Sequence, residues 1–467
     1  MDFKKVKSVN AVAFFNILGP VILNGINFFT IPIFTRVLGT ADYGLYTIYS
    51  TWVNTFTIII SLQVSGTIGV ANVRIEDEER KKYYSSILSL VWFTFLAILI
   101  VALIFLPDLK MSLGLSEEMI ILMIVHSFGM AFVNFAIARY TYEKKSYLTF
   151  GISVSVAVLG IGLSLLFLYS GFFDKNLYYG RAYGAAIPYI FIGIFFYLLY
   201  AVQGKSFFEK KYWKFALPLC LPLIFHGLSQ LVLGQADRIM LQNMTNDSIV
   251  GIYSFTYSFA QVMNIIYNAF NNTWVPFYYE DLKEQRLERI QKRTHNYVYV
   301  FTALSIGFML LAPEVIKLFA GEDFWSGISL VPIIVLGNYM VFLYSFPVNY
   351  EFYHKKSIHI AIGTGMAAVM NCIMNFVFIP FWGMHGAALA TFLSYALLWA
   401  FHHIVSKYFI RQGYHYRVKD FLPGIGIMLI ATIGTAFLQD YMFIRWGLAL
   451  VVGILGLQHI IKTKSIF

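Results

Sequence analysis

The chain has 467 residues, of which 59% are hydrophobic, 18% aromatic and only 12% charged, and its net charge is +10. A soluble domain carries about 25% charged residues, so a chain this apolar cannot cover its surface with water-compatible side chains, and most of that surface is expected to face lipid. The basic excess would suggest nucleic acid in a soluble protein, but it fits the Lys- and Arg-rich cytoplasmic loops of a membrane protein.

Fourteen stretches are apolar over about 20 residues, the length that a helix needs to cross a membrane. They run approximately over 11–34, 44–70, 85–106, 117–139, 147–170, 180–202, 215–236, 249–275, 295–319, 327–350, 358–380, 384–407, 420–439 and 441–461. The first stretch is too long for the apolar region of a signal peptide and is interpreted as a retained span. The runs are continuous rather than alternating, so the predicted fold is an all-α polytopic membrane protein of about 14 transmembrane helices.

The basic residues alternate along this series of spans. With the N-terminus inside, 27 of the 34 Lys and Arg residues fall in the inner segments. A wrong helix count would be expected to scramble that distribution, because the excess of Lys and Arg marks the cytoplasmic side. Both termini are therefore predicted to be cytoplasmic.

Two basic pentapeptides, YEKKS from Tyr142 and YHKKS from Tyr353, fall in inner connections and suggest an internal repeat. Other pairs lie at a common offset: Pro20 with Pro222, Arg36 with Arg238, and Gly184 with Gly386. These matches place spans 1–6 over spans 7–12, which predicts two six-helix lobes related by a pseudo-two-fold axis along the membrane normal, plus two C-terminal helices. The predicted domains are residues 1–203, 204–412 and 413–467.

Three segments resemble a known family. They are IPIFTRVLGTADYGLYTIYS from Ile31, ADRIMLQNMTNDSIVGIYSFTYSFAQ from Ala236, and IPFWGMHGAALATFLSY from Ile379. Together they resemble the Wzx-type polysaccharide flippases of the multidrug/oligosaccharidyl-lipid/polysaccharide exporter superfamily, over about residues 10–410. The resemblance implies a non-enzymatic transporter without cofactors, which flips a polyprenyl-diphosphate-linked oligosaccharide from the inner to the outer leaflet of the bacterial cytoplasmic membrane by alternating access, for surface polysaccharide assembly.

Neutral polar side chains lie deep in several spans, and amides suit sugar hydroxyls because they offer both donors and acceptors. The candidates for a substrate cavity are Asn24, Asn27, His126, Asn134, His226, Gln230, Gln235, Asn264, Asn268 and Asn271. Asn264, Asn268 and Asn271 form one stripe on their helix. Hydrogen bonding between helices is an equally open interpretation. His126 and His226 could also couple transport to protons.

Charged residues and prolines at equivalent positions of the two lobes form a second set. Arg36 and Arg238, at the outer ends, and Arg139, at an inner end, are candidates for diphosphate contact or for anchoring helix ends. Arg181 is interpreted as a solvated loop residue. Pro20 and Pro222 are candidate helix bends, either moving gate elements or static kinks.

Two other functions remain open. A cation-coupled multidrug-type exporter of the same superfamily relies on an intramembrane carboxylate, and the sequence offers no clear one, although Asp237, Glu314 and Glu351 come closest to the membrane interior. A membrane-embedded polysaccharide polymerase or ligase tends to carry a sizeable outer loop with catalytic residues, which is not seen here.

Few features point to a metal site or to protein partners. Cys220 and Cys372 have no CxxC partner, so no metal site is predicted. The segment from Glu280 to His295 is expected to be a solvated or interfacial connector helix, or else a docking site for polysaccharide polymerase and chain-length machinery.

Overall fold

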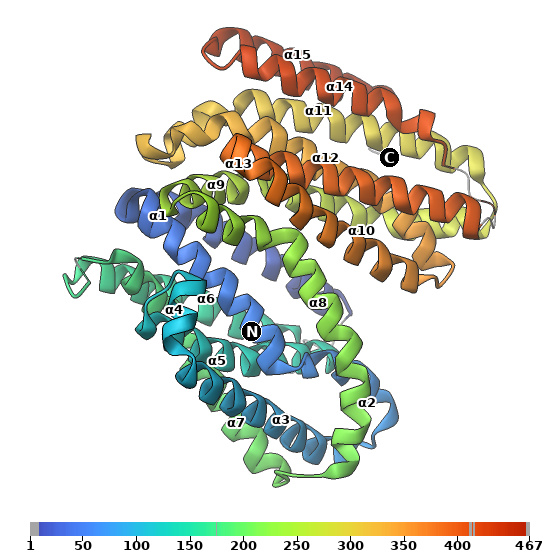
Figure 1. Ribbon diagram of the computed structural model, residues 1–467. Helices are drawn as coiled ribbons and strands as arrows, with labels where there is room; N and C mark the ends of the chain where they lie inside the picture. Colours follow the sequence, from blue (N-terminus) through green and yellow to red (C-terminus); the bar gives the residue numbers. More distant parts are fainter. Residues whose placement is uncertain (1–8, 174, 411–412, 414–415, 464–467) are drawn as a thin grey trace. The chain divides into compact units, whose positions relative to one another are not determined.

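The structure is a computed structural model that describes residues 9–173, 175–410, 413 and 416–463, without the side chains of residues 9–21, 23, 24 and 27. Every regular element among these residues is a helix (Figure 1). The all-α prediction is therefore confirmed. Lipid offers the backbone no hydrogen-bond partners, and a helix satisfies its own N–H and C=O groups within one segment.

The first of two compact units comprises residues 1–231. Its helices are α1 (Val9–Ser61), α2 (Ile68–Arg74), α3 (Asp77–Ile104), α4 (Leu106–Leu113), α5 (Glu117–Tyr142), α6 (Ser146–Tyr169), α7 (Leu177–Gly204) and the first part of α8 (Lys210–Met244). α5 is central, with 72% of its apolar stretch buried. The backbones of α5 and α7 approach closely at Gly129: a Cβ added to this glycine would lie only 2.7 Å from the Cα of Ile190. Small residues permit such close approach of membrane helices.

The second unit comprises residues 232–467. After the end of α8 it contains α9 (Asp247–Ala260), α10 (Val262–Lys283), α11 (Leu287–Phe319), a 3₁₀ segment (Glu322–Leu330), α12 (Val331–Tyr353), α13 (Ser357–Ile404), a π-helical segment (Val405–Ile410), α14 (Val418–Phe437) and α15 (Met442–Thr463). The span that ends with α12 is 78% buried, whereas α15 is only 6% buried. α15 therefore presents most of its surface to lipid.

The number of membrane crossings depends on how two long helices are divided. Among the described residues, 11 helices are long and apolar enough to span, or 12 when Phe28–Ser61 and Val64–Arg74, bent by 49°, count as one. α1 and α13 each contain a glycine with positive φ, at Gly39 (66°) and Gly383 (52°). Each of these two helices holds two of the predicted spans, and dividing them at the glycines gives the fourteen segments predicted from the sequence.

The two pentapeptides adopt the same local conformation in their respective units. α5 ends at Tyr142 and α12 at Tyr353. The following lysines, Lys144 and Lys355, take left-handed φ angles of 57° and 58°. The next helices then begin at Ser146 and Ser357. The repeated sequence thus encodes a repeated turn between two helices.

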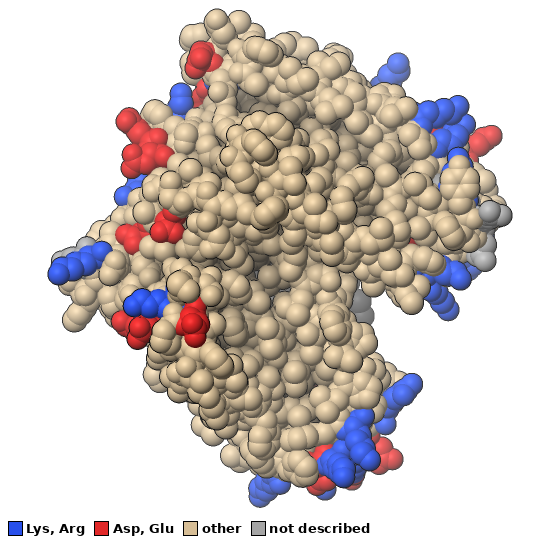
Figure 2. All heavy atoms as spheres, viewed as in Figure 1, with Lys and Arg blue, Asp and Glu red and all other residues tan. Residues whose placement is uncertain are grey.

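Charged side chains gather near helix ends on the face drawn in Figure 2, and uncharged residues cover the lengths of the helices between them. This distribution suits a surface in contact with hydrocarbon, where a charge is costly. The two compact units divide the chain within α8, at Leu231. The domain boundaries inferred from the repeat stay a prediction.

A buried arginine fastens α15 to α11. Arg445 is 2% exposed. Its guanidinium pairs with both carboxylate oxygens of Glu314, at 2.8 and 2.5 Å, and donates to the carbonyls of Leu310 and Leu438 at 2.8 and 3.0 Å. The Trp446 indole donates to Glu314 as well, at 3.3 Å. Bidentate arginine–carboxylate pairs are among the stronger polar contacts, so this cluster holds the otherwise lipid-facing α15.

Just after the C-terminal end of α5, Glu143 joins two basic side chains. Its carboxylate accepts from Arg139 Nε at 2.7 Å and from Lys145 Nζ at 2.6 Å. Burial raises the pKa of Glu143, but the hydrogen bonds from Lys145 and Arg139 lower it by more, so the net pKa lies below the ordinary value of 4.5.

The Arg445 contact predicts a stability change. Replacing Arg445 with Met leaves Glu314 without its cation, and we expect the free energy of unfolding to fall by about 3 kcal/mol. The double variant Arg445→Met/Glu314→Leu should recover part of this loss, because no charge is left unpaired. Thermal unfolding in detergent measures both, with the exposed Lys317→Met as control. A wild-type melting temperature for Arg445→Met would contradict the assignment.

The Glu143 contact predicts a pH dependence. Because its folded-state pKa is lowered, the carboxylate contributes stability that is fully present above the unfolded-state pKa and is lost as the pH falls through the folded-state pKa. Glu143→Gln should therefore lower the melting temperature at neutral pH, and its difference from wild type should vanish in acid. The exposed Glu78→Gln serves as control. A difference that persists unchanged in acid would refute the ion-pair contribution.

Candidate functional site

In unit 1, the candidate cavity residues fall in different surroundings. His126 is buried, with Nδ1 3.0 Å from the Tyr49 hydroxyl and its ring 5.2 Å from that of Tyr189. Asn134 is half-buried on the same helix, α5. His126 is thus packed inside the unit as a hydrogen-bond partner. The side chains of Pro20, Asn24 and Asn27 lie outside the described residues.

The candidate arginines of unit 1 also differ. Arg36 is exposed on α1. The Arg139 guanidinium lies over the rings of Tyr84, Tyr140 and Tyr200 at 5.0, 5.6 and 4.7 Å, in addition to its ion pair with Glu143. A cation over aromatic faces gains electrostatic stabilisation. The charge of Arg139 is therefore already engaged within its own unit.

The interpretation of Arg181 as a solvated loop residue is wrong. α7 begins at Leu177, a few residues earlier than predicted, and includes Arg181. Its guanidinium lies 3.8 Å from the ring centre of Phe34 and donates to Ser164 Oγ at 2.9 Å. It lines a cavity of about 280 Å³, whose walls also include Tyr46, Ser153 and Tyr189. The hydropathy pattern missed this residue because its charge lies next to the predicted helix end.

The candidates on α8 are mostly accessible. His226 and Gln230 are exposed, and Gln235 is half-buried. Pro222 is exposed, and the helix is continuous through it. The backbone irregularities inside described spans lie instead at Gly39, Gln63 and Gly383.

Asp237 and Arg238, near the end of α8, have separate partners. Asp237 is 3% exposed and accepts from the Tyr253 hydroxyl and, at 2.9 Å, from the backbone N–H of Arg238. The Arg238 guanidinium lies 5.2 Å from the ring centre of Tyr257. Tyr253 and Tyr257 both come from α9, so this polar cluster joins α8 to α9.

The asparagines of α10 divide into two kinds. Asn264 donates to Asn338 Oδ1 at 3.1 Å, and Asn271 accepts from Asn349 Nδ2 at 2.9 Å; both partners lie on α12. Asn268 is exposed. Asn264 and Asn271 thus make hydrogen bonds between helices and Asn268 is exposed, while the place of all three in a substrate cavity stays a prediction.

α13 contains a buried polar cluster that sequence reasoning missed. Asn375 donates to Asn371 at 2.9 Å, and Asn371 donates to Thr391 at 3.4 Å. Asn371 and Asn375 are fully buried, and the Asn375 Oδ1 atom has no hydrogen-bond partner. In the sequence, the four-residue spacing of Asn371 and Asn375 puts both amides on one helical face and was the pattern that could have indicated this cluster.

Two of the carboxylates that the sequence placed closest to the membrane interior are buried within unit 2. Glu351 on α12 is completely buried and pairs with the equally buried His402 of α13, with Oε1 2.9 Å from Nδ1. Asp237 is a second buried carboxylate. Glu351 lies near the end of α12, as its place before the basic pentapeptide predicted, whereas its pairing with His402 was missed because that partner lies 51 positions away.

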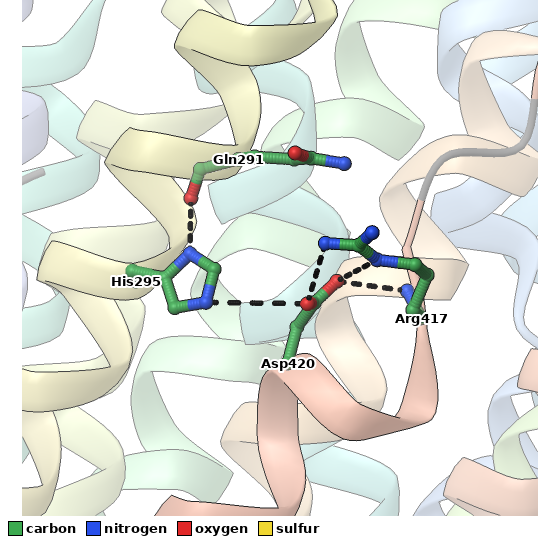
Figure 3. Close-up of polar contacts among 4 residues, drawn as sticks. All are labelled: Gln291, His295, Arg417 and Asp420. Carbon is green, nitrogen blue, oxygen red and sulfur yellow. Dashed lines mark hydrogen bonds and ion pairs between the residues drawn. The ribbon is translucent and has the colours of Figure 1, made fainter.

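A further polar cluster lies where α11 meets the start of α14 (Figure 3). The Asp420 carboxylate accepts from the Arg417 guanidinium, whose Nη2 lies 3.2 Å from Oδ1, and the same oxygen lies 4.0 Å from His295 Nε2. The other ring nitrogen of His295, Nδ1, lies 2.8 Å from the carbonyl oxygen of Gln291. This cluster borders a largely apolar cavity of about 330 Å³ between α11, α14 and α15.

The predicted connector helix from Glu280 to His295 does not form as one element. α10 ends at Lys283 and α11 begins at Leu287. Near this turn Asp281 is buried and forms an ion pair with Arg293, and Arg289 Nη1 lies 3.6 Å from its Oδ1 atom. Among the described residues, no group of three or more His, Cys, Asp or Glu side chains is arranged to hold a metal ion.

Two relatives are proteins of Haemophilus influenzae. The chain is 25% identical over 342 residues to a protein of the Lsg locus, covering 71% of this chain and 81% of that protein. It is 21% identical over 389 residues to an uncharacterised membrane protein, covering 79% and 92%.

Two solved structures share the fold. The lipid II flippase MurJ, in an inward closed conformation, matches with a TM-score of 0.70 at 17% identity over 95% of this chain and 98% of that chain. An inward-facing multidrug resistance transporter of the MATE family matches with a TM-score of 0.63 at 14% identity over 84% and 96%. The chain is a multi-pass membrane protein with the fold of these transporters.

The sequence model of the polysaccharide biosynthesis protein family matches residues 11–280, which is more than half of the chain. The chain therefore belongs to the polysaccharide biosynthesis protein family.

Proposed function

We propose that this chain is a flippase for lipid-linked oligosaccharides. It moves a polyprenyl-diphosphate-linked repeat unit from the inner to the outer leaflet of the bacterial cytoplasmic membrane by alternating access, with both termini cytoplasmic. The flipped unit then enters surface polysaccharide assembly, where a polymerase and chain-length machinery are the expected partners. The observation that supports this proposal is that a chain of the polysaccharide biosynthesis family has the fold of a lipid II flippase.

The surroundings of the polar residues suggest which of them meet the substrate. His226, Gln230 and Asn268 are exposed, and their polar atoms suit the hydroxyls of a sugar. Arg36, also exposed, suits a diphosphate through charge-assisted hydrogen bonds. Arg139 and Arg238 have their guanidinium groups over tyrosine rings and are weaker candidates for the same contact.

A multidrug-type exporter is the second candidate function. Such transporters of the superfamily resemble this chain in fold, and the burial of Asp237 and Glu351 supplies the kind of carboxylate that cation-coupled export requires. Its substrates would be cationic drugs rather than lipid-linked sugars, which makes the two functions separable in the cell.

Deleting the gene in its native host tests the proposed function. We expect one polyprenyl-diphosphate-linked oligosaccharide to accumulate and the matching surface polymer to be lost, because the lipid-linked unit no longer reaches the outer leaflet. Lipid extraction and mass analysis measure the first, and analysis of the surface polymer measures the second. An unchanged lipid-linked pool with new sensitivity to cationic drugs would favour the exporter.

Variants in the deletion strain test the division between exposed and hydrogen-bonded residues. Gln230→Ala and Asn268→Ala should reduce surface polymer and leave the melting temperature unchanged, because they remove solute-facing groups. Asn271→Ala should instead lower the melting temperature, because Asn349 loses its acceptor, at a cost of about 1 kcal/mol. The reverse pattern would reject the assignment of Gln230 and Asn268 as substrate contacts.

A further inference from the structure

Glu351, His402 and Ser406 form a buried triad within unit 2. Glu351 lies near the end of α12, His402 near the end of α13, and Ser406 in the π-helical segment that continues α13. All three residues are completely buried. Glu351 Oε1 accepts from Ser406 Oγ at 3.2 Å and lies 2.9 Å from His402 Nδ1. With the imidazole proton on Nδ1, this single oxygen receives two hydrogen bonds.

The other polar atom of each ionisable group has no partner. Neither Glu351 Oε2 nor His402 Nε2 makes a hydrogen bond. Since Oε1 is already occupied by two donors, an additional proton has two places to bind, Oε2 or Nε2. In the first case the pair is a carboxylic acid and a neutral imidazole, and in the second it is a carboxylate and an imidazolium. Without that proton the triad carries one buried negative charge.

Among the described side chains, no Lys or Arg makes an ion pair with this carboxylate. Within the described part of the chain, Glu351 bonds to His402 and Ser406 alone. Tyr344 stacks on the His402 ring with centres 6.2 Å apart, and a Cβ at Gly363 would lie 2.8 Å from Nε2. Titratable or charged groups on elements that pack against α12 or α13 include Tyr279 of α10, Tyr350 of α12, His359 and His403 of α13, Lys407 of the π-helical segment and Asp420 of α14.

The equivalent place in unit 1 has a different chemistry. At the repeat offsets, Glu351 corresponds to Tyr140 and His402 to Tyr200, and both tyrosine rings lie beside the Arg139 guanidinium. Ser406 corresponds to Gly204, where α7 ends, whereas in unit 2 the helix continues as a π-helix. Unit 1 thus fills these two positions with tyrosines and needs no carboxylate–imidazole pair there. In unit 2 a π-helical segment lies beside the pair, and such segments are frequent at functional sites.

We propose that Glu351 and His402 form a proton-binding site of the transporter. A proton from water binds at Oε2 or Nε2 and converts the triad from one negative charge to none. Burying an unpaired carboxylate is costly, and a proton at either atom removes that uncompensated charge. Release requires water to reach the pair, which happens when the ends of α12 and α13 move apart. Proton binding is thereby linked to the packing of these two helices.

The binding step is tested without any transport substrate. Full-length protein in nanodiscs is stepped from alkaline to acidic buffer while infrared difference spectra record the C=O stretch of carboxylic acids, which reports a proton on Oε2, and the ring bands of imidazolium, which report a proton on Nε2. We expect a band that is lost in Glu351→Gln and retained in Glu284→Gln, a partly exposed glutamate of the same unit. His402→Gln should shift the pH at which the band appears. An unchanged spectrum in Glu351→Gln overturns the proposal.

Glu351→Gln is chosen because an amide oxygen still accepts from His402 and Ser406. Gel filtration and melting temperature establish that it folds. Should it fail to fold, His402→Gln decides the question, because it keeps the carboxyl group and removes the imidazole. A band at the wild-type pH in that variant would then overturn the shared site.

The link to movement rests on the proposed function and is measured separately. In proteoliposomes loaded with the labelled lipid-linked oligosaccharide, a pH gradient should change the wild-type flipping rate about tenfold, and Glu351→Gln should flip at a rate independent of the gradient. An equal response in the variant overturns the coupling. A wild-type protein that flips nothing overturns the proposed function, while the infrared result still decides the proton site.

Discussion

In each unit, the pairing of polar groups follows from the absence of water around the helices. In hydrocarbon, a polar group that lacks a hydrogen-bond partner in the protein cannot bond to water instead. The helices satisfy the backbone, and polar side chains within them must then find each other. Asn264 reaches Asn338, Asn349 reaches Asn271, and Asn375 reaches Asn371. The first two of these pairs join α10 to α12 and help to hold the two helices in register, whereas the third lies within α13.

The same constraint explains which charged groups the units tolerate inside. Asp237 receives a tyrosine hydroxyl and a backbone N–H, and Glu351 receives an imidazole and a serine hydroxyl. Arg139 and Arg238 are placed over tyrosine rings, which suit a cation without adding a formal charge. The many tyrosines of this chain thus serve the interior as neutral partners for ionisable groups.

Much of the fold was predictable because it depends on local sequence. Continuous apolar runs gave the helices, and the repeated pentapeptides identified turns that share a left-handed lysine, at Lys144 and Lys355. The site was less predictable, because side-chain partners are set by tertiary packing. The pairing of Glu351 with His402, and of Asn271 with Asn349, joins residues 51 and 78 positions apart. Hydropathy carries no information on such pairs, nor on the contacts of Arg181 with Phe34 and Ser164, which lie far from it in sequence.

The pairing of Arg445 with Glu314 has a consequence for how the chain enters the membrane. α11 is synthesised well before α15, so Glu314 waits near the end of its helix without a cation until the last helix arrives. Arg445 in turn enters an apolar environment in which a lone guanidinium is unfavourable. The ion pair therefore favours α15 beside α11, where the carboxylate compensates the guanidinium. A chain without Arg445 would leave Glu314 without its cation, so the stability of α11 depends on the presence of α15.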